Sequence, residues 1–422
     1  MPDCKIWRFF EVGKNIEHNT IIIAIMKIVV DYLKKDLGKP NLTSWDELRR
    51  GYLERAANIV KDDWQSPSYL TSLTSQAGRR EGRIIGNISD YTRDQHDLSL
   101  AYEKKYAKEY LPRIGILPIE PYVTSSGMAA LTTILVMFHR AIGVDVTVLA
   151  GKHSYFQNLE ILTKSFAKVI LFDENDESEW KELIEREKPK VVFVDSLCNE
   201  SSLTKPPVTQ IAEQMSKVLK TQSYLVVDNS MMATKFEFKS ALKYRSSRLG
   251  IIGFESLNKY HQFGLDRVTG GIVWGNSIRL SVMLNQARRH AGTIMPDISA
   301  LMLPTPNIKI MRLYLDRIWE NREILQKIIG ERCIGQAAQV VIKFENKISY
   351  EKIQKIIKKI IARAKKEKVQ IVAGTSFGMP NTRIYLTARQ SEFTEMFLRV
   401  SVGTEEIDQI EKIADIIKQV VG

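Results

Sequence analysis

The segment KVVFVDS, residues 190–196, decides the fold of this 422-residue chain. Its apolar residues follow one another without polar alternation, which is typical of a strand that is buried on both faces of a sheet. Similar runs lie on both sides of it, namely VDVTVLA (144–150), KVILFD (168–173) and SYLVVD (223–228). Because stretches of helical pattern separate these runs, we expect an α/β fold with a mostly parallel central sheet and helices on both faces.

Two of these runs bring a carboxylate to the end of a strand. Asp195 lies near the end of the run at 190–196, and Asp228 is the last residue of the run at 223–228. Open parallel sheets bind their ligands in the crevice outside the carboxyl ends of the strands. We therefore expect both carboxylates to lie at a ligand-binding crevice.

The pattern changes after about residue 295. There we expect helices at 307–329, 350–367 and 404–421, with strands at 339–344, 369–373 and 397–402. Because these elements do not alternate strictly, they indicate a smaller C-terminal α+β domain. The N-terminal region is mainly helical, and SWDE at 44–47 fits the capping box that begins a helix. The sequence thus divides into a helical segment at 1–90, a large α/β domain at 91–300 and a small domain at 301–422.

Cysteine content and hydropathy limit the class of protein. Cys4, Cys198 and Cys333 lie far apart and form no C-x-x-C pair, which excludes a disulfide framework and a zinc ribbon. We therefore expect a reducing, cytoplasmic setting. The longest apolar stretch, at 21–30, contains Lys27 and is half of the roughly 20 residues needed to cross a bilayer. We expect no membrane partner.

The net charge is +12, from 61 Lys and Arg residues against 49 Asp and Glu residues. The densest basic run, QKIIKKIIARAKKEK at 354–368, places Ile356, Ile357, Ile360 and Ile361 at helical spacing with lysines between them. That is the pattern of an amphipathic surface helix. No aromatic residue interleaves with the lysines, as single-strand binding requires, so we expect no nucleic-acid partner.

One segment combines small residues with the start of a helix. In SSGMAALTTILVMFHRA, residues 125–141, Ser126 and Gly127 directly precede a helical stretch. A helix N-terminus offers unpaired N–H groups and the positive end of a dipole, and glycine lets a phosphate approach the backbone. A phosphate site and a simple helix cap are both consistent with this segment alone.

A second segment, SLNKY at 256–260, carries Lys259 and is followed by Thr269-Gly270-Gly271 ahead of an apolar run. A lysine that forms a Schiff base, a carboxylate that pairs with a pyridinium nitrogen and a phosphate cup are the fixtures of a pyridoxal 5'-phosphate (PLP) site. The cup at Ser126, Asp228 and Lys259 occur in that order along one predicted sheet. Read together, they favour a PLP enzyme.

These segments resemble the Cys/Met-metabolism family of fold type I PLP enzymes, which includes cystathionine synthases, cystathionine lyases and methionine lyase. The resemblance runs from about residue 90 to residue 422 and its motifs fall in family order. The matching motifs are Tyr91-x-Arg93, Ser126-Gly127-Met128, Tyr155, the segment 195–199 ending in Asn199, Val227-Asp228-Asn229, Ser256-x-Asn258-Lys259-Tyr260, the segment 375–378 and Arg399-x-Ser401-x-Gly403.

The resemblance implies a role for each matched residue. It assigns catalysis to Lys259, Tyr155 and Asp228. It assigns substrate-carboxylate binding to Ser376 and Arg399. It assigns cofactor binding to Ser126, Gly127, Met128, Tyr155, Asn199, Asp228, Ser256, Asn258 and Lys259, and to Tyr91 and Arg93.

The resemblance also implies the assembly. Tyr91 and Arg93 resemble the segment by which one subunit grips the cofactor phosphate of its neighbour, so the N-terminal 90 residues would include a dimer arm. We expect a homodimer with shared active sites, and a homotetramer of two such dimers. An ion pair of Arg93 with Asp94 or Asp97 of its own chain is the alternative.

The sequence departs from the family pattern where the family binds its substrate. Phe156-Gln157 follows Tyr155 in place of two glycines, Phe263 takes a glycine position, and His261 is displaced. Pro304-Thr305-Pro306 and Arg383-Ile384-Tyr385 replace two further segments. We expect β- or γ-elimination or replacement on a small amino acid. Another PLP reaction, such as that of an aldolase, decarboxylase or transaminase, and a non-catalytic binding role remain alternatives.

The other chemically active side chains receive simpler interpretations. Cys198 is expected to be a buried apolar filler, and because it precedes Asn199, an approach to the cofactor is the alternative. His153 lies two residues before Tyr155 and is a candidate for supporting the site. The spacing of His96, His261 and His290 does not suggest a metal site, and we expect none.

Overall fold

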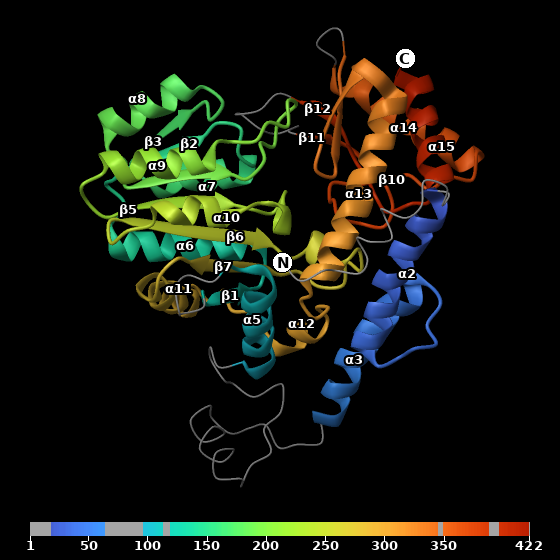
Figure 1. Ribbon diagram of the computed structural model, residues 1–422, viewed down its shortest axis with the longest axis horizontal. Coiled ribbons are helices and arrows are strands. Elements are labelled where there is room, and N and C mark those ends of the chain that lie inside the picture. The colour runs from blue at the N-terminus through green and yellow to red at the C-terminus, as the bar shows by residue number, and fades with distance from the viewer. Residues whose placement is uncertain (1–17, 64–95, 113–118, 345–348, 388–395, 422) are drawn as a thin grey trace, which may run out of the picture.

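The computed structural model describes residues 18–63, 96–112, 119–344, 349–387 and 396–421. Its strands form two sheets, one of seven strands in the order β1-β7-β6-β5-β4-β2-β3 and one of five in the order β10-β11-β12-β9-β8. In Figure 1 the larger sheet with its helices occupies one half of the molecule, and the smaller sheet lies in the other half beside the long helix α13 (Ile308–Ile329).

The large sheet contains the four strands that the sequence predicts. Strands β6, β5, β4, β2 and β3 pair in parallel, whereas β7 is antiparallel to both β6 and β1. The strands are β1 (Pro121–Thr124), β2 (Thr147–Gly151), β3 (Lys168–Phe172), β4 (Val191–Asp195), β5 (Ser223–Asp228), β6 (Leu249–Ser256) and β7 (Gly271–Gly275).

Helices cover both faces of this sheet, as expected. Helices α6 (Gly127–Ala141), α7 (Phe156–Ser165) and α11 (Ile278–Ala291) pack on one face through one core cluster. Helices α8 (Glu177–Glu187), α9 (Val208–Val218) and α10 (Phe238–Ala241) pack on the other face through a second cluster. Because both faces are covered, the strands between them are apolar along their whole length.

The C-terminal half holds the smaller α+β unit. Its strands are β8 (Cys333–Gln336), β9 (Gln339–Ile342), β10 (Val372–Ala373), β11 (Arg383–Thr387) and β12 (Phe397–Ser401). Helix α14 (Tyr350–Lys366) buries Ile353, Ile357, Ile360 and Ala364 on one face, and its lysines lie outside this buried face. The helix is therefore amphipathic, as predicted. Helix α15 (Ile407–Val421) packs beside it.

Helices from the N-terminal region lie beside both units. Helix α2 (His18–Leu37) packs against α13, and α3 (Trp45–Asp63) follows it (Figure 1). The predicted capping box forms, because the Glu47 N–H donates to Ser44 Oγ at 3.2 Å and the Ser44 N–H donates to the Glu47 carboxylate at 3.1 Å. Helices α5 (Asp97–Tyr110) and α12 (Asp297–Leu301) pack beside β1 and α3.

The α/β fold class is confirmed, and the boundaries at residues 90 and 300 stay a prediction. The sequence did not identify β1, β6, β7, β8 or β11 as strands. None of the described helices is long and apolar enough to cross a membrane.

Candidate functional site

A cavity of about 590 Å³ lies at the carboxyl ends of β4 and β5, between the two sheets. Its walls combine predicted residues from the large unit with residues of the small one. The predicted residues that line it are Ser126, Gly127, Met128, Tyr155, Asn199, Asp228, Ser256, Asn258, Lys259 and Arg399. Tyr91 and Arg93 lie outside the described residues.

Asp228 lies on the wall of the cavity as a buried carboxylate. Its oxygens accept hydrogen bonds from the Asn158 side-chain amide at 2.8 Å and from the Ser230 N–H at 2.9 Å. Burial raises the pKa of Asp228 in spite of these two bonds. Asp195 is its register neighbour on β4, and burial together with the charge of Asp228 raises the pKa of Asp195 well above its ordinary value.

Neither carboxylate forms an ion pair with a lysine or arginine of the described chain. Two neighbouring buried carboxylates without a cation are unfavourable in their charged form, because the hydrogen bonds that they accept offset only part of the lost hydration. The wall of the cavity therefore presents a site for a positively charged group.

Lys259 reaches the cavity from the loop that follows β6. Its ammonium donates to Ser376 Oγ at 3.1 Å and lies 4.9 Å from the centre of the Phe377 ring. Burial, and then the nearby charge of Arg399, lower the pKa of Lys259 to about 8. Gly378, with φ +71°, lets the small unit approach closely, since a Cβ there would lie 2.9 Å from the Lys259 carbonyl carbon.

The start of α6 forms another wall of the cavity. Ser126 caps the helix, since its hydroxyl accepts a hydrogen bond from the Ala129 N–H at 3.0 Å. A Cβ at Gly127 would lie 2.9 Å from Ser256 Cβ, and one at Gly271 would lie 2.1 Å from the Ser126 carbonyl oxygen. These glycines let the helix start and the β6 end meet, which places N–H groups and two serine hydroxyls at one point of the cavity.

Asn258 and Ser256 also shape this wall through the loops they hold. The Asn258 side-chain oxygen accepts a hydrogen bond from the Gly270 N–H at 2.7 Å, and the Ser256 N–H donates to Ser230 Oγ at 2.8 Å. The Ser256 hydroxyl in turn accepts a hydrogen bond from the Asn258 N–H at 3.4 Å. These bonds fix the loop that carries Lys259.

Arg399, on β12, is a buried cation at the cavity. Its guanidinium donates to Asn199 Oδ1 at 3.2 Å and to the Thr375 carbonyl at 2.6 Å, while its Nε has no hydrogen-bond partner in the described part of the chain. No carboxylate of that part pairs with it, and burial lowers the pKa of Arg399 to about 10. Arg399 remains charged at neutral pH and has a free N–H to offer an anion.

Tyr155 lies where β2 turns into α7. Its N–H donates to the Asp195 carboxylate at 3.0 Å and its hydroxyl donates to Gln157 Oε1 at 2.7 Å. The Phe156 ring lies edge-on to it, with centroids 5.0 Å apart, and both Phe156 and Gln157 line the cavity. These bulky residues therefore form part of the wall of the cavity, and a reshaped substrate site stays a prediction.

Two other departures from the family pattern do not line the cavity. Phe263 packs in a core cluster with Tyr314 at 5.6 Å between ring centroids. His261 is buried, with its Nε2 2.6 Å from the Glu255 carboxylate and its ring between Tyr106 and Tyr110. The side chain of Phe263 thus packs against α13 and is not among the residues that line the cavity.

Sequence reasoning missed some residues of the site. Asn158 orients Asp228, and its only signal is an amide on the otherwise apolar buried face of α7. Thr387 lines the cavity from β11, a strand that the sequence analysis did not identify, beside Tyr385 of the segment that the sequence analysis named as a departure from the family pattern. Ser376, a predicted substrate residue, contacts Lys259 and is not among the residues that line the cavity.

These residues fit the PLP that the sequence resemblance implies. The unpaired carboxylate of Asp228 suits a protonated pyridine nitrogen, and the α6 start with Ser126 and Ser256 suits a phosphate. Lys259, with a lowered pKa, suits a bond to the cofactor's aldehyde carbon. The three features lie around one cavity, as a single cofactor requires.

Part of the sequence is similar to a known protein. The chain is 24% identical over 318 residues to the bifunctional enzyme flvA of Aspergillus flavus. This alignment covers 69% of this chain and 37% of flvA. The chain therefore spans little more than a third of the length of this relative.

Solved structures share the fold. Cystathionine gamma synthase from Xanthomonas oryzae pv. oryzae, in complex with cystathionine, superposes with a TM-score of 0.63 at 16% identity, over 80% of this chain and 89% of the other. Cystathionine gamma-lyase from Lactobacillus plantarum, complexed with L-serine, gives a TM-score of 0.62 at 16% identity, over 84% and 93% of the two chains. These likenesses confirm the predicted fold of type I PLP enzymes.

The family is established by sequence. The model of the Cys/Met metabolism PLP-dependent enzymes matches residues 118–332, which is half of the chain and includes Ser126, Asp228 and Lys259. The match covers the large sheet and the segments that carry the cofactor features of the cavity. The chain therefore belongs to the family of Cys/Met metabolism PLP-dependent enzymes.

Proposed function

We propose that this enzyme carries out β- or γ-elimination or replacement on a small amino acid, using Lys259 as its catalytic base. One observation carries the proposal. The cavity holds a buried cation without a carboxylate, Arg399, and a buried carboxylate without a cation, Asp228, with Lys259 beside them. An amino acid joined to PLP supplies both missing charges, since it brings a carboxylate and a pyridine nitrogen.

The chemistry divides between cofactor and protein. When bound, PLP supplies an electron sink for a carbanion at the substrate's α carbon. Asp228 holds the proton on the ring nitrogen, and Arg399 binds the substrate carboxylate with its free N–H. Lys259, with its pKa lowered to about 8, removes and returns the proton at the α carbon. Ser376 accepts a hydrogen bond from Lys259 and orients it.

Two comparisons support this class of reaction. The Xanthomonas oryzae neighbour is described in complex with aminoacrylate and cysteine, and the Lactobacillus plantarum neighbour with L-serine. These ligands are small amino acids or their dehydrated products. Phe156, Gln157 and Tyr385 add large side chains to the wall of the cavity that also holds Arg399, which supports a small side chain in this chain's substrate as well.

We also propose the assembly and setting that the sequence implies. Tyr91 and Arg93 are assigned to the phosphate of a partner subunit, in a homodimer that pairs into a homotetramer. In the described chain the two basic residues lining the cavity, Lys259 and Arg399, are engaged by Ser376, Asn199 and Thr375. A partner arginine would supply the missing phosphate charge. The proposed setting is the reducing cytoplasm.

A substrate screen tests the reaction. The purified PLP-loaded protein is incubated with cysteine, homocysteine, cystathionine, methionine, serine and the O-acylated homoserines, and release of ammonia, thiol and 2-oxo acid is measured. We expect thiol or acyl release together with 2-oxo acid, or a replacement product when a thiol is added. Lys259→Ala is the control and should release nothing. Carbon dioxide or amino-group transfer without side-chain release would assign a different PLP reaction.

A further inference from the structure

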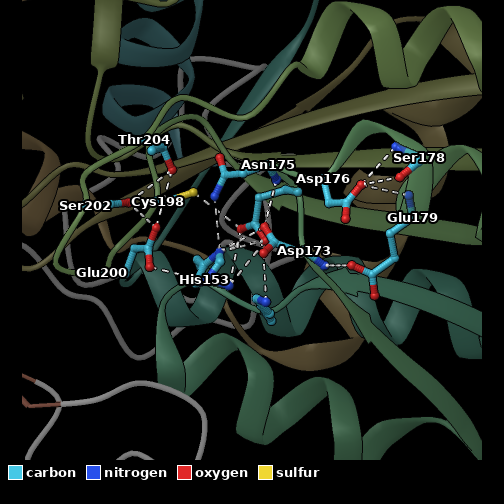
Figure 2. Close-up of polar contacts among 12 residues, drawn as sticks. His153, Asp173, Asn175, Asp176, Ser178, Glu179, Cys198, Glu200, Ser202 and Thr204 are labelled. Carbon is cyan, nitrogen blue, oxygen red and sulfur yellow. Dashed lines mark hydrogen bonds and ion pairs between the residues drawn. The ribbon is translucent and has the colours of Figure 1, made fainter.

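A cluster of ligand-type side chains lies beside the cavity, at the carboxyl ends of three parallel strands. His153 follows β2, Asp173 and Glu174 follow β3, and Cys198 and Glu200 follow β4. Figure 2 shows His153, Asp173, Cys198 and Glu200 grouped together. We call these five residues the β2–β4 cluster. None of them is among the residues that line the cofactor cavity.

The donor atoms of the cluster are spaced as metal ligands are. His153 Nδ1 lies 3.2 Å from Glu174 Oε2, and Cys198 Sγ lies 3.5 Å from Glu174 Oε1. The donor atoms of these three residues all lie within 4.8 Å of one another. Zinc bonds of about 2.0–2.3 Å at tetrahedral angles separate neighbouring donors by roughly 3.3–3.7 Å. The spacing therefore leaves room for one ion at the centre.

The side chains of the cluster carry an excess of negative charge. Glu174 and Cys198 are fully buried, and the His153 side chain is 15% exposed. No described lysine or arginine pairs with Glu174, whereas Lys152 binds the Oδ2 atom of Asp173 at 2.8 Å. The carboxylates of Asp173, Glu174 and Glu200 therefore outnumber the single lysine by two when His153 is neutral. A divalent ion balances this excess.

The orientation of His153 is also that of a metal ligand. Its Nε2 lies 3.2 Å from the Glu200 carboxylate, and its Nδ1 lies 3.2 Å from the Glu174 carboxylate. With the ring proton on Nε2, where Glu200 accepts it, the lone pair of Nδ1 would be available to a metal ion beside Glu174. The arrangement matches the carboxylate–histidine pairs that orient zinc ligands. Asp173 Oδ1, 3.7 Å from the same Nδ1, is placed to complete the coordination.

We propose that the β2–β4 cluster binds a zinc ion through His153 Nδ1, the Glu174 carboxylate and Cys198 Sγ, with Asp173 or a water molecule as the fourth ligand. The mixture of nitrogen, sulfur and oxygen selects zinc over magnesium and calcium, which take oxygen ligands. As the Zn–S bond forms, the Cys198 thiol releases its proton to solvent, so the bound sulfur is a thiolate. No step of this binding requires an oxidant or reductant.

The ion would act on the active site through the backbone. The Asn199 N–H donates to the His153 carbonyl at 2.8 Å, and the Asn199 side chain accepts a hydrogen bond from Arg399. Tyr155 follows His153 by two residues. A zinc ion that joins His153 to Cys198 would thus fix the two segments that present Tyr155 and Asn199 to the cavity.

The sequence expectation of no metal missed this cluster for a physical reason. Its ligands come from three segments of chain, at 153, 173–174 and 198–200, without the short spacing of a zinc motif. Only the parallel order of β2, β3 and β4 in the sheet brings them together.

Zinc binding by the full-length, untagged, PLP-loaded protein tests the proposal. The protein is dialysed against a zinc buffer, its metal content is measured by mass spectrometry, and its affinity is measured by competition with a chromophoric chelator. We expect about one zinc per chain. Cys198→Ser and His153→Gln should each lose the ion, and Glu200→Gln should weaken it by about 10- to 100-fold. Cys333→Ser, at a buried thiol outside the cluster, is the matched control and should bind as the parent does.

A second measurement keeps the test independent of variant folding. X-ray absorption at the zinc edge of the parent protein should show one sulfur neighbour at about 2.3 Å together with nitrogen or oxygen neighbours. Zinc that binds without sulfur, zinc lost equally in Cys333→Ser, or no zinc above the level of the His153→Gln variant would each overturn the proposal. Because metal content is the readout, failure here leaves the proposed reaction untouched.

Discussion

The ionisation of Lys259 decides when the site can take up its cofactor. A lysine attacks an aldehyde only as the neutral amine, and burial beside Arg399 lowers the pKa of Lys259 to about 8. The fraction of Lys259 that is neutral thus rises with pH and levels off above about pH 8, whereas an ordinary lysine would level off only above its pKa of 10.5. We predict that the rate of PLP uptake by the apoprotein rises about tenfold per pH unit below 8 and is flat above it, as followed by absorbance in stopped flow.

Two variants should move this profile in opposite directions. Asp266 raises the pKa of Lys259 and Arg399 lowers it. Asp266→Asn should therefore move the bend of the profile to lower pH, and Arg399→Gln should move it to higher pH. A bend that both variants leave in place would show that another group controls uptake.

Asp228 is the second decisive residue. Asp228→Asn keeps the size of the side chain but removes the negative charge that holds the ring-nitrogen proton. We predict that the variant still binds PLP but loses at least about 10³-fold in kcat, since each 1.4 kcal/mol of lost transition-state stabilisation costs tenfold. Asp195→Asn, one strand away, is the control and should lose much less, because its carboxylate binds the Tyr155 N–H instead. Near-normal turnover in Asp228→Asn would mean that the ring nitrogen has another partner.

At the scale of elements, the N-terminus of α6 is held against the end of β6 by glycine. Gly127→Ala would place a Cβ 2.9 Å from Ser256 Cβ and 3.2 Å from Ser256 Cα, so the helix start or the end of β6 would have to shift. We predict at least a tenfold rise in the Kd for PLP, about 1.4 kcal/mol, measured by fluorescence titration. Gly374→Ala, whose nearest atom is the flexible end of Arg383, is the control. Equal affinities in the two variants would remove α6 from the phosphate site.

The same elements show how far sequence alone predicts this fold. The continuous apolar runs of β2, β3, β4 and β5 are recognisable because burial on both faces leaves no polar residues in them. Strand β6 was missed because Gly250 and Gly253 interrupt its pattern. These glycines are required by packing, since a Cβ would lie 2.8 Å from Tyr224 at the first and 2.4 Å from Trp274 at the second.

The candidate site was predictable in part for a related reason. Asp228 ends β5 of the predicted parallel sheet, so its position at the carboxyl edge follows from the parallel order. Lys259 follows β6, which the sequence did not identify, so its place in the site was indicated by its motif and not by a strand. Asn158, Tyr385 and the contact of Ser376 with Lys259 depend on side-chain directions and on how the small sheet faces the large one. Local sequence patterns do not predict how side chains of distant segments pack against one another.

At the scale of the whole molecule, the predicted role of Tyr91 and Arg93 makes each active site the product of two chains. We predict that mixing an inactive Arg93→Ala chain with an inactive Lys259→Ala chain restores activity, because a mixed dimer then contains one intact site. Co-expression with two different tags and sequential purification isolates the mixed dimer. Mixed dimers that stay as inactive as both parents would assign Arg93 to its own chain, paired with Asp94 or Asp97.

The identity of the lysine bonded to PLP tests the account's central claim most directly. The PLP-loaded protein is reduced with borohydride, digested, and searched by mass spectrometry for the lysine that carries the pyridoxyl phosphate group. The account predicts one modified site, Lys259, and a visible absorption band that Lys259→Ala lacks and Lys235→Ala keeps, since Lys235 pairs with Asp316 and does not line the cavity. Modification of another lysine, or of none in a protein saturated with PLP, would contradict it.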